Sequence, residues 1–301
     1  MPHPNPSPEG EGLYFGRALS ILRHVILPNT PQHAGDVAGH YDELDRVYRE
    51  CWGEHVHHGL WTTGREPPER AVEALIDMVA ERLEIAPAMA CADIGCGYGG
   101  TARRIATTRG AAVRGFTLSA EQAGYAAGHP VANVTIEVRD WLANDLPDAA
   151  FDCAWSIESS EHMVDKPRFF AEAFRVLKPG ARFAVCAWLA ETGASPRKVR
   201  HLLEPICREG RLPSMGTREE YEDWARDAGF VAVGYEDISR KVAKTWTICA
   251  RRFLGKLLTD RWYRRLLRHA ENRVFALSVP RLILAYRTGA MRYGVFVWEK
   301  A

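Results

Sequence analysis

The sequence lacks long hydrophobic runs, a marked excess of charge of either sign, and closely paired cysteines. Its 301 residues carry 39 Lys and Arg against 38 Asp and Glu, so the overall charge does not indicate a polyanionic partner. No apolar stretch approaches the roughly 20 residues that a membrane-spanning helix requires. The chain is long enough to bury a sizeable core as one large α/β domain or as one domain with an appended cap.

The seven cysteines are odd in number and widely scattered, at positions 51, 91, 96, 153, 186, 207 and 249. None forms the CxxC pair expected of a zinc or redox site, and several lie in apolar runs, where a thiol behaves as a small hydrophobic group. We therefore expect no metal site and a reducing, cytoplasmic compartment, with any membrane contact peripheral.

Composition and periodicity divide the chain into four parts. Residues 1–12, rich in Pro, Gly and Ser, are predicted to be a disordered leader without signal-peptide features. Residues 13–64 are predicted to form a helical N-terminal lid, with helices near 13–26 and 38–50. Residues 65–190 form the predicted core, and residues 191–301 complete it and add a helical cap at about 195–227 and 240–291.

Within the core, short apolar strands alternate with helices, which is typical of βαβ units and a mostly parallel sheet. The predicted strands cover residues 89–94, 111–117, 133–138, 151–157, 181–188, 230–238 and 293–298, and the predicted helices between the first strands cover 99–109, 119–128 and 166–177.

A glycine-rich turn, D-I-G-C-G-Y-G-G at residues 93–100, follows the first of these strands and precedes a helix. Its Gly95, Gly97 and Gly100 fit the pattern G-x-G-x-x-G, in which bare backbone approaches a ligand and the helix offers free N–H groups. The same pattern fits a dinucleotide-binding oxidoreductase, and a tight turn without ligand is the structural alternative.

Neighbouring residues indicate which kind of ligand the glycine-rich turn would bind. The Asp93 carboxylate suits an ammonium group and repels a pyrophosphate. The second strand ends in Gly115–Ser119 without an acid to bind a ribose, which weakens both interpretations equally. Asp140 and Trp141, after the third strand, offer an acceptor for an adenine amino group and an aromatic neighbour.

The glycine turn resembles motif I of the class I methyltransferases that use S-adenosylmethionine (SAM). The stretch G-F-T-L-S-A-E-Q at residues 115–122 resembles one found in the branch of tocopherol methyltransferases, sterol methyltransferases and cyclopropane synthases, where its Thr-Leu-Ser and Gln positions lie near the cofactor ribose. W-G-E-H-V-H-H-G at 52–59 and W-S-I-E-S-S-E-H-M-V-D-K at 155–166 are similar to motifs of the gamma-tocopherol methyltransferase group. The likeness runs from about Tyr41 to Lys300; Ser160 stands where the group usually has glycine, and residues 240–275 depart further.

This resemblance implies a Rossmann-like α/β sandwich, with a seven-stranded, mostly parallel sheet, helices on both faces, an N-terminal lid and a C-terminal cap insertion. It also implies that SAM is the cofactor. The residues expected to bind it are Tyr41, Asp93, Gly95, Cys96, Gly97, Thr117, Leu118, Gln122, Asp140, Trp141 and Ser156. His57, His58 and Trp246 are predicted to contact the methyl acceptor; histidines so close in sequence cannot easily converge on one metal ion, so the resemblance implies a lid here.

Three candidate catalytic residues, Glu158, Glu161 and His162, follow the fourth strand, at the end of a parallel sheet where ligands bind. His162 could act as a base near neutral pH, and either glutamate could stabilise a cation formed by alkene methylation. The alternative is structural: Glu158 would cap backbone groups, and Glu161 and His162 would form a local pair.

Residues 240–273 contain eleven Lys and Arg interleaved with Trp246, Phe253, Trp262 and Tyr263. Such a block could bind a diphosphate or acidic substrate, or make transient contact with an anionic membrane. An amphipathic cap with a solvated face is the simpler and favoured interpretation. No recognised nucleic-acid-binding motif accompanies it, and we expect no nucleic-acid partner.

The sequence therefore predicts a SAM-dependent methyltransferase acting on a hydrophobic small molecule, such as an isoprenoid, a prenylated phenol or another secondary metabolite, with methylation at carbon favoured. Alternatives are an O- or N-methyltransferase of a tailoring pathway, an NAD(P)-dependent oxidoreductase, and a SAM-binding protein without catalysis. The sequence indicates neither the acceptor nor the oligomeric state.

Overall fold

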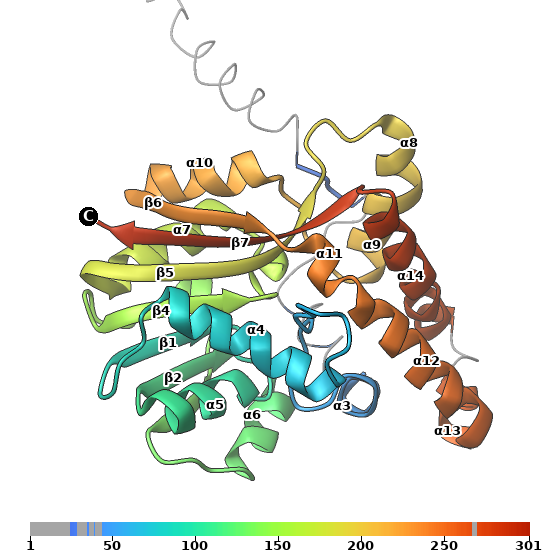
Figure 1. The fold of residues 1–301 in the computed structure, drawn as a ribbon, viewed down its shortest axis with the longest axis horizontal. Helices are drawn as coiled ribbons and strands as arrows, with labels where there is room; N and C mark the ends of the chain where they lie inside the picture. Colours follow the sequence, from blue (N-terminus) through green and yellow to red (C-terminus); the bar gives the residue numbers. More distant parts are fainter. Residues whose placement is uncertain (1–24, 29–34, 36–38, 40–43, 267–269) are drawn as a thin grey trace, which may run out of the picture.

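The computed structural model describes residues 25–28, 35, 39, 44–266 and 270–301, and within these a seven-stranded sheet lies between two layers of helices (Figure 1). The strands are β1 (Ala90–Ile94), β2 (Ala112–Thr117), β3 (Val134–Val138), β4 (Phe151–Ile157), β5 (Leu177–Ala190), β6 (Phe230–Asp237) and β7 (Met291–Lys300), in the order β3-β2-β1-β4-β5-β7-β6. Strands β1 to β5 pair in parallel, and β7 runs antiparallel to both of its neighbours, β5 and β6. The predicted fold class is confirmed.

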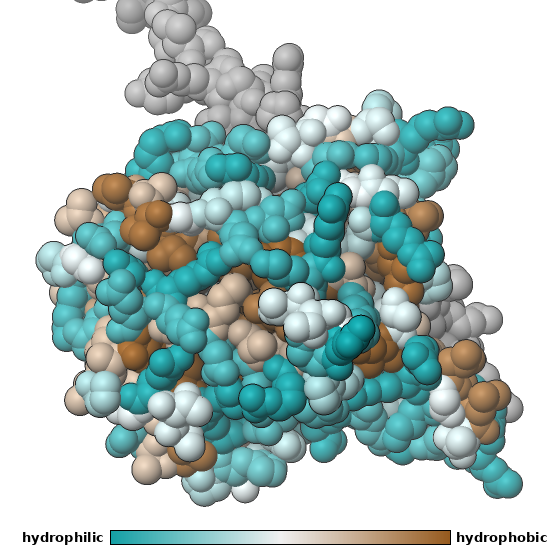
Figure 2. Space-filling model, viewed as in Figure 1, coloured by the Kyte–Doolittle hydropathy of each residue, from teal (hydrophilic) through white to brown (hydrophobic). Residues whose placement is uncertain are grey.

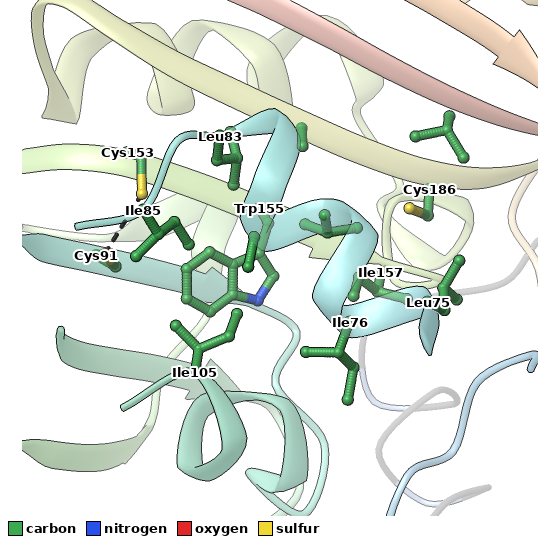
Figure 3. Packing of buried hydrophobic residues seen from close by; sticks show 14 of the residues in the cluster. Leu75, Ile76, Leu83, Ile85, Cys91, Ile105, Cys153, Trp155, Ile157 and Cys186 are labelled. Carbon is green, nitrogen blue, oxygen red and sulfur yellow. Dashed lines mark hydrogen bonds between the residues drawn. The ribbon is translucent and has the colours of Figure 1, made fainter. Parts of the chain in front are cut away.

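The helices of the core cover both faces of the sheet. They are α4 (Pro68–Arg82), α5 (Gly100–Arg109), α6 (Ala120–Ala127), α7 (Lys166–Val176) and α10 (Arg218–Ala228). Apolar residues of α4 and α5 pack on one face, and those of α7 and α10 on the other. Figure 3 shows Trp155 of β4 among Ile76, Ile85 and Ile105 in the first of these layers, and its ring is fully buried. Strands buried on both faces explain why the central segments are continuously apolar.

The remaining helices gather beside the carboxyl ends of the parallel strands (Figure 1). They are α3 (Asp45–Cys51), α8 (Pro196–Lys198), η3 (Val199–Leu203), α9 (Glu204–Glu209), α11 (Ser239–Val242), α12 (Lys244–Thr259), α13 (Arg261–Leu266) and α14 (Ala270–Arg287). Within the cap region predicted at 195–227, the segment η3 is π-helical and lies just before Pro205, which has no N–H to donate to the preceding turn. Leu203, Trp246 and Leu282 belong to an apolar cluster that joins η3, α12 and α14.

The predicted leader and the helix predicted near 13–26 lie almost entirely outside the described residues. The helix predicted at 38–50 is described as α3, and the chain then runs without regular structure through residues 52–61, here called the lid segment. Backbone bonds from Leu60 to Ala71 and from Trp61 to Lys241 attach the lid segment to α4 and α11. All seven cysteines are buried free thiols. None of the described helices is both long enough and apolar enough to cross a bilayer.

Candidate functional site

A cavity opens at the carboxyl ends of β1, β2 and β4 and encloses about 750 Å³ of space, including its open mouth. Its lining includes the following predicted cofactor residues: Gly95, Gly97, Thr117, Leu118, Gln122, Asp140 and Trp141. We call it the glycine-turn cavity.

The first two glycines of the turn serve different purposes. Both have left-handed backbone, with φ of 77° at Gly95 and 54° at Gly97. A Cβ at Gly95 would lie 2.2 Å from Cβ of Ser159, so this glycine lets Ser159 pack against the turn. A Cβ at Gly97 would meet nothing closer than Nε2 of Gln122, at 3.9 Å. Gly97 therefore keeps bare backbone at the cavity wall, as a ligand cradle requires.

Polar groups stand on both sides of this cavity in fixed orientations. Thr117 Oγ1 donates to Oε1 of Gln122 over 2.7 Å, which holds the Gln122 amide at the cavity wall. Asp140 accepts a hydrogen bond from the backbone N–H of Leu142, and Trp141 Nε1 donates to the Phe169 carbonyl. The cavity thus offers a hydroxyl and an amide near the turn, from Thr117 and Gln122. It also offers a carboxylate beside an indole, from Asp140 and Trp141. This set of groups fits a ligand that carries a ribose and an amino-substituted base. These residues therefore fit SAM.

Three predicted cofactor residues lie behind the turn and do not line the cavity. Asp93 is 2% exposed, and burial raises the pKa of its carboxyl group to about 7. Ser156 Oγ is hydrogen-bonded to Ser159 Oγ at 2.6 Å, and the Cys96 thiol is also buried. Asp93 and Ser156 lie within β1 and β4, Cys96 lies in the turn itself, and none of the three side chains lines the cavity. Tyr41 lies outside the described residues.

A second cavity, of about 620 Å³ including its opening, adjoins the first, and Val56, Glu158 and His162 line both. The lid segment and the cap supply most of its other walls. These walls are Tyr48, Trp52, Glu161, Trp188, Ile206, Gly210, Leu212, Trp246, Ser278 and Leu282, with no Lys or Arg among the described lining residues. We call this the aromatic cavity. Its position beyond the glycine-turn cavity is where a methyl acceptor would have to lie.

Glu158 stands at the junction of the two cavities, at the end of β4. Its φ of 53° is in the left-handed region, a strained backbone that is typical of functional sites. The carboxylate accepts hydrogen bonds from the His58 backbone N–H at 2.6 Å and His58 Nδ1 at 2.8 Å. It also accepts from Tyr293 Oη at 2.8 Å and Trp188 Nε1 at 3.0 Å. Burial alone raises the pKa of Glu158, but the charge and hydrogen bonds of His58 bring it below its ordinary value, so the buried carboxylate stays ionised.

The two histidines predicted to contact the acceptor do not line the aromatic cavity. His58 is fully buried and binds Glu158 through Nδ1, while its Nε2 lies 3.2 Å from Tyr286 Oη. His57 Nδ1 is hydrogen-bonded to the His58 carbonyl, and its ring lines a separate cavity between α3, α4 and α12. The lid segment directs one ring toward the sheet end and the other away from it, so the structure does not bring either histidine to the wall of the aromatic cavity. Trp246, the third predicted acceptor contact, does line the aromatic cavity.

Glu161 and His162 lie on the short helix η2 (Ser160–His162) and have opposite titration properties. Glu161 Oε1 accepts a hydrogen bond from the Trp188 backbone N–H at 2.5 Å, and burial raises the pKa of its carboxyl group to about 7. Burial lowers the pKa of His162 to about 4. His162 is therefore a neutral, weakly basic ring, and Glu161 is the group able to exchange a proton near neutral pH.

Several residues of the site were not predicted from the sequence. Tyr293 comes from the last strand and Tyr286 from α14, more than 120 positions from Glu158. Trp188 is the last residue of the predicted fifth strand, Tyr48 lies in a predicted helix, and Trp52 begins the W-G-E-H-V-H-H-G motif, but none of the three was predicted to contact the acceptor. To predict the two tyrosines as part of the site, one would have had to know from the sequence that β7 inserts beside β5.

Comparison with known proteins agrees with this geometry. The chain matches the family of mycolic acid cyclopropane synthetases over residues 29–261. It is 32% identical over 285 residues to a probable chloroplastic tocopherol O-methyltransferase of Oryza sativa subsp. japonica, covering 88% of this chain and 77% of that protein. It is 30% identical over 216 residues to squalene methyltransferase 1 of Botryococcus braunii, covering 68% and 57%.

Among solved structures, mycolic acid cyclopropane synthase CmaA1, complexed with SAH and CTAB, has the same fold, with a TM-score of 0.80 at 20% identity over 90% of this chain and 99% of that one. The family match covers most of the chain, and the glycine-turn cavity has the groups that SAM needs. The chain therefore belongs to the mycolic acid cyclopropane synthetase family and is a class I SAM-dependent methyltransferase.

Proposed function

We propose that this enzyme methylates an alkene carbon of an uncharged, isoprenoid-type acceptor held in the aromatic cavity. The observation that carries the proposal is the junction of the two cavities at Glu158, where an ionised carboxylate meets a wall of aromatic rings. The names of the relatives support an isoprenoid-type acceptor, since they include tocopherol and squalene methyltransferases.

When bound in the glycine-turn cavity, SAM supplies a methyl group that its positive sulfur has already activated. The chain's own residues then have to hold the acceptor in line, exclude water and deal with the charge that develops. Trp52, Trp188 and Trp246 line the aromatic cavity, where they can hold an apolar chain and keep water out.

The lining of the aromatic cavity favours an uncharged acceptor over a diphosphate. A diphosphate needs cationic side chains or a coordinated metal, and the described lining of this cavity supplies carboxylates instead of Lys or Arg. The basic residues of the cap, which the sequence suggested as a diphosphate site, are not among the lining residues.

Alkene methylation forms a C–C bond with the π electron pair, and the S–CH₃ electrons remain on sulfur, which leaves a carbocation on the acceptor. The faces of Trp188 and Trp246 and the Glu158 carboxylate can stabilise that cation. Loss of a proton from a neighbouring carbon to Glu161 restores a double bond. Glu161 suits this step because it lines the cavity and its pKa lies near 7.

O-methylation of a prenylated phenol is the second candidate function, and the tocopherol O-methyltransferase relative supports it. A phenol would have to lose its proton, and His162, with a pKa near 4, is a weak base for that purpose. Glu161 would have to accept the proton in this case too.

The test is incubation with trideuteromethyl-labelled SAM and three acceptors: squalene, a prenylated hydroquinone and geranyl diphosphate. We expect the label on carbon of an uncharged acceptor, located by NMR and mass spectrometry, with no transfer to the diphosphate. Label found only on oxygen would favour the second candidate, and transfer only to geranyl diphosphate would contradict an uncharged acceptor.

A further inference from the structure

The outer tip of the cap, formed by residues 251–266 of α12 and α13, exposes apolar side chains to solvent. Leu254 and Leu258 are 59% and 75% exposed, and they lie four positions apart on α12, on one face of the helix. Figure 2 shows hydrophobic atoms at the lower right of the molecule, where Figure 1 places α12 and α13, surrounded by hydrophilic ones. We call residues 251–266 the cap tip.

Arginines surround these leucines. Arg251, Arg261 and Arg265 are exposed, and no acidic side chain pairs with any of them within the part of the chain that the structure describes. Asp260 is the only acid in the sequence of the cap tip, and its Oδ2 forms an ion pair with Nη2 of Arg46 at 2.6 Å. The exposed charge of the cap tip is therefore positive.

The first turn of the same helix lines the aromatic cavity. Trp246 of α12 lines that cavity, together with Leu282 of α14. Arg264 donates to the carbonyls of Leu257 and Leu258 and so fixes α13 against the end of α12. Helix α12 thus connects the exposed leucines with the wall of the aromatic cavity.

We propose that the cap tip docks on anionic lipid bilayers, with Leu254 and Leu258 inserted between the headgroups and the three arginines against lipid phosphates. An apolar face with a basic border is the pattern of helices that lie in the membrane interface. The proposal rests on the proposed function in one respect, since docking there lets a lipid acceptor pass from the bilayer to the aromatic cavity.

The test is flotation of the full-length protein with phosphatidylcholine vesicles, with and without phosphatidylglycerol, in the absence of any acceptor. We expect binding only to the anionic vesicles and its loss at high salt. Changing Arg251, Arg261 and Arg265 together to Gln should weaken binding about a hundredfold. The pair Leu254→Ser and Leu258→Ser should weaken it about tenfold.

Two control variants remove the same kinds of side chain at other places on the surface. Val231→Ser with Val233→Ser removes apolar side chains of similar exposure on β6. Arg168→Gln with Arg197→Gln and Arg200→Gln removes three other exposed arginines. Both controls should bind vesicles as the wild type does, and all variants should keep the wild-type melting temperature and SAM affinity.

Several outcomes would overturn the docking surface: no binding to anionic vesicles, equal loss in the controls, or a leucine variant that only converts a dimer into a monomer in light scattering. Transfer to a short, water-soluble acceptor, measured in parallel, keeps the two proposals separate. Failed vesicle binding with intact transfer rejects docking alone, and failed transfer with intact binding rejects the proposed acceptor alone.

Discussion

Nδ1 of His58 lies 2.8 Å from Oε2 of Glu158, and both side chains are almost inaccessible to solvent, at 1% and 6%. The contact joins the lid segment to the end of β4 across 100 positions of sequence. Burial alone would raise the pKa of Glu158, and the charge and hydrogen bonds of His58 are the main causes that lower it. The lid segment therefore supplies the partner that keeps the buried carboxylate at the cavity junction ionised.

Replacing His58 by Ala should strongly destabilise the protein, because it leaves Glu158 buried without its principal partner. Breaking a buried pair in this way costs about 3–5 kcal/mol. Urea unfolding at neutral pH measures the change, and His129→Ala, which removes an exposed ring, is the control. A loss no larger than that of the control would show that the pair does not matter for stability.

Tyr293→Phe should lower turnover while leaving SAM affinity close to that of the wild type. It removes one of four donors to Glu158, and Tyr293 does not line the glycine-turn cavity. A hydrogen bond to a charged group contributes about 1.5–3 kcal/mol, so we expect a clear loss of stability as well. Steady-state kinetics and calorimetry with SAM measure both effects, with Tyr235→Phe as the control. Unchanged turnover would contradict the role given to the Glu158 cluster.

Ala substitutions at the two glycines should separate folding from binding. Both positions have left-handed backbone, which costs an Ala about 1–2 kcal/mol. At Gly95 the new Cβ also meets Ser159 at 2.2 Å, so Gly95→Ala should lose much more stability. Gly97→Ala should fold and bind SAM poorly, because its Cβ projects into open space at the cavity wall. Thermal unfolding and SAM titration of both variants test this, and tight SAM binding by Gly97→Ala would contradict the cradle.

The sheet was predictable from the sequence because each strand is a short apolar run between glycine-rich or polar turns, and all seven predicted strands are present. The start of β5 was missed: the strand begins at Leu177, before Pro179 and Gly180, where pairing with β4 changes register. Pro and Gly normally mark the end of a strand. Here they interrupt the pairing of β5 with β4 only locally, and the strand continues beyond them.

The site was predictable where neighbouring residues act together, as in the glycine turn and Thr117–Gln122. It was not predictable where partners come from distant elements. The W-S-x-E pattern made Glu158 a candidate, yet nothing in the sequence near His58 indicated that its ring would be hydrogen-bonded to Glu158. Pairings of this kind depend on how the lid segment and β7 pack, which local periodicity does not encode.

Glu161→Gln should change how stability depends on pH. In the folded state Glu161 keeps its proton up to about pH 7, whereas in the unfolded chain it releases it near its ordinary value of 4.5. The unfolded state is therefore increasingly favoured as pH rises between these values, and wild-type stability falls across that window. Glutamine does not ionise, so the variant should lose less stability there, while Asp93 contributes equally to both proteins. Melting temperatures between pH 4 and 8 test this, and parallel curves would contradict the buried, proton-holding Glu161.

The most direct test of the account is single-turnover methyl transfer by Glu158→Gln, with SAM affinity measured on the same preparation. Glutamine keeps the shape of the side chain and removes the charge that faces both cavities. We predict SAM binding within about threefold of the wild type and transfer slowed about a hundredfold or more, since the cation loses the ionised carboxylate at the cavity junction. Transfer at the wild-type rate by a folded, SAM-binding Glu158→Gln variant would contradict the account.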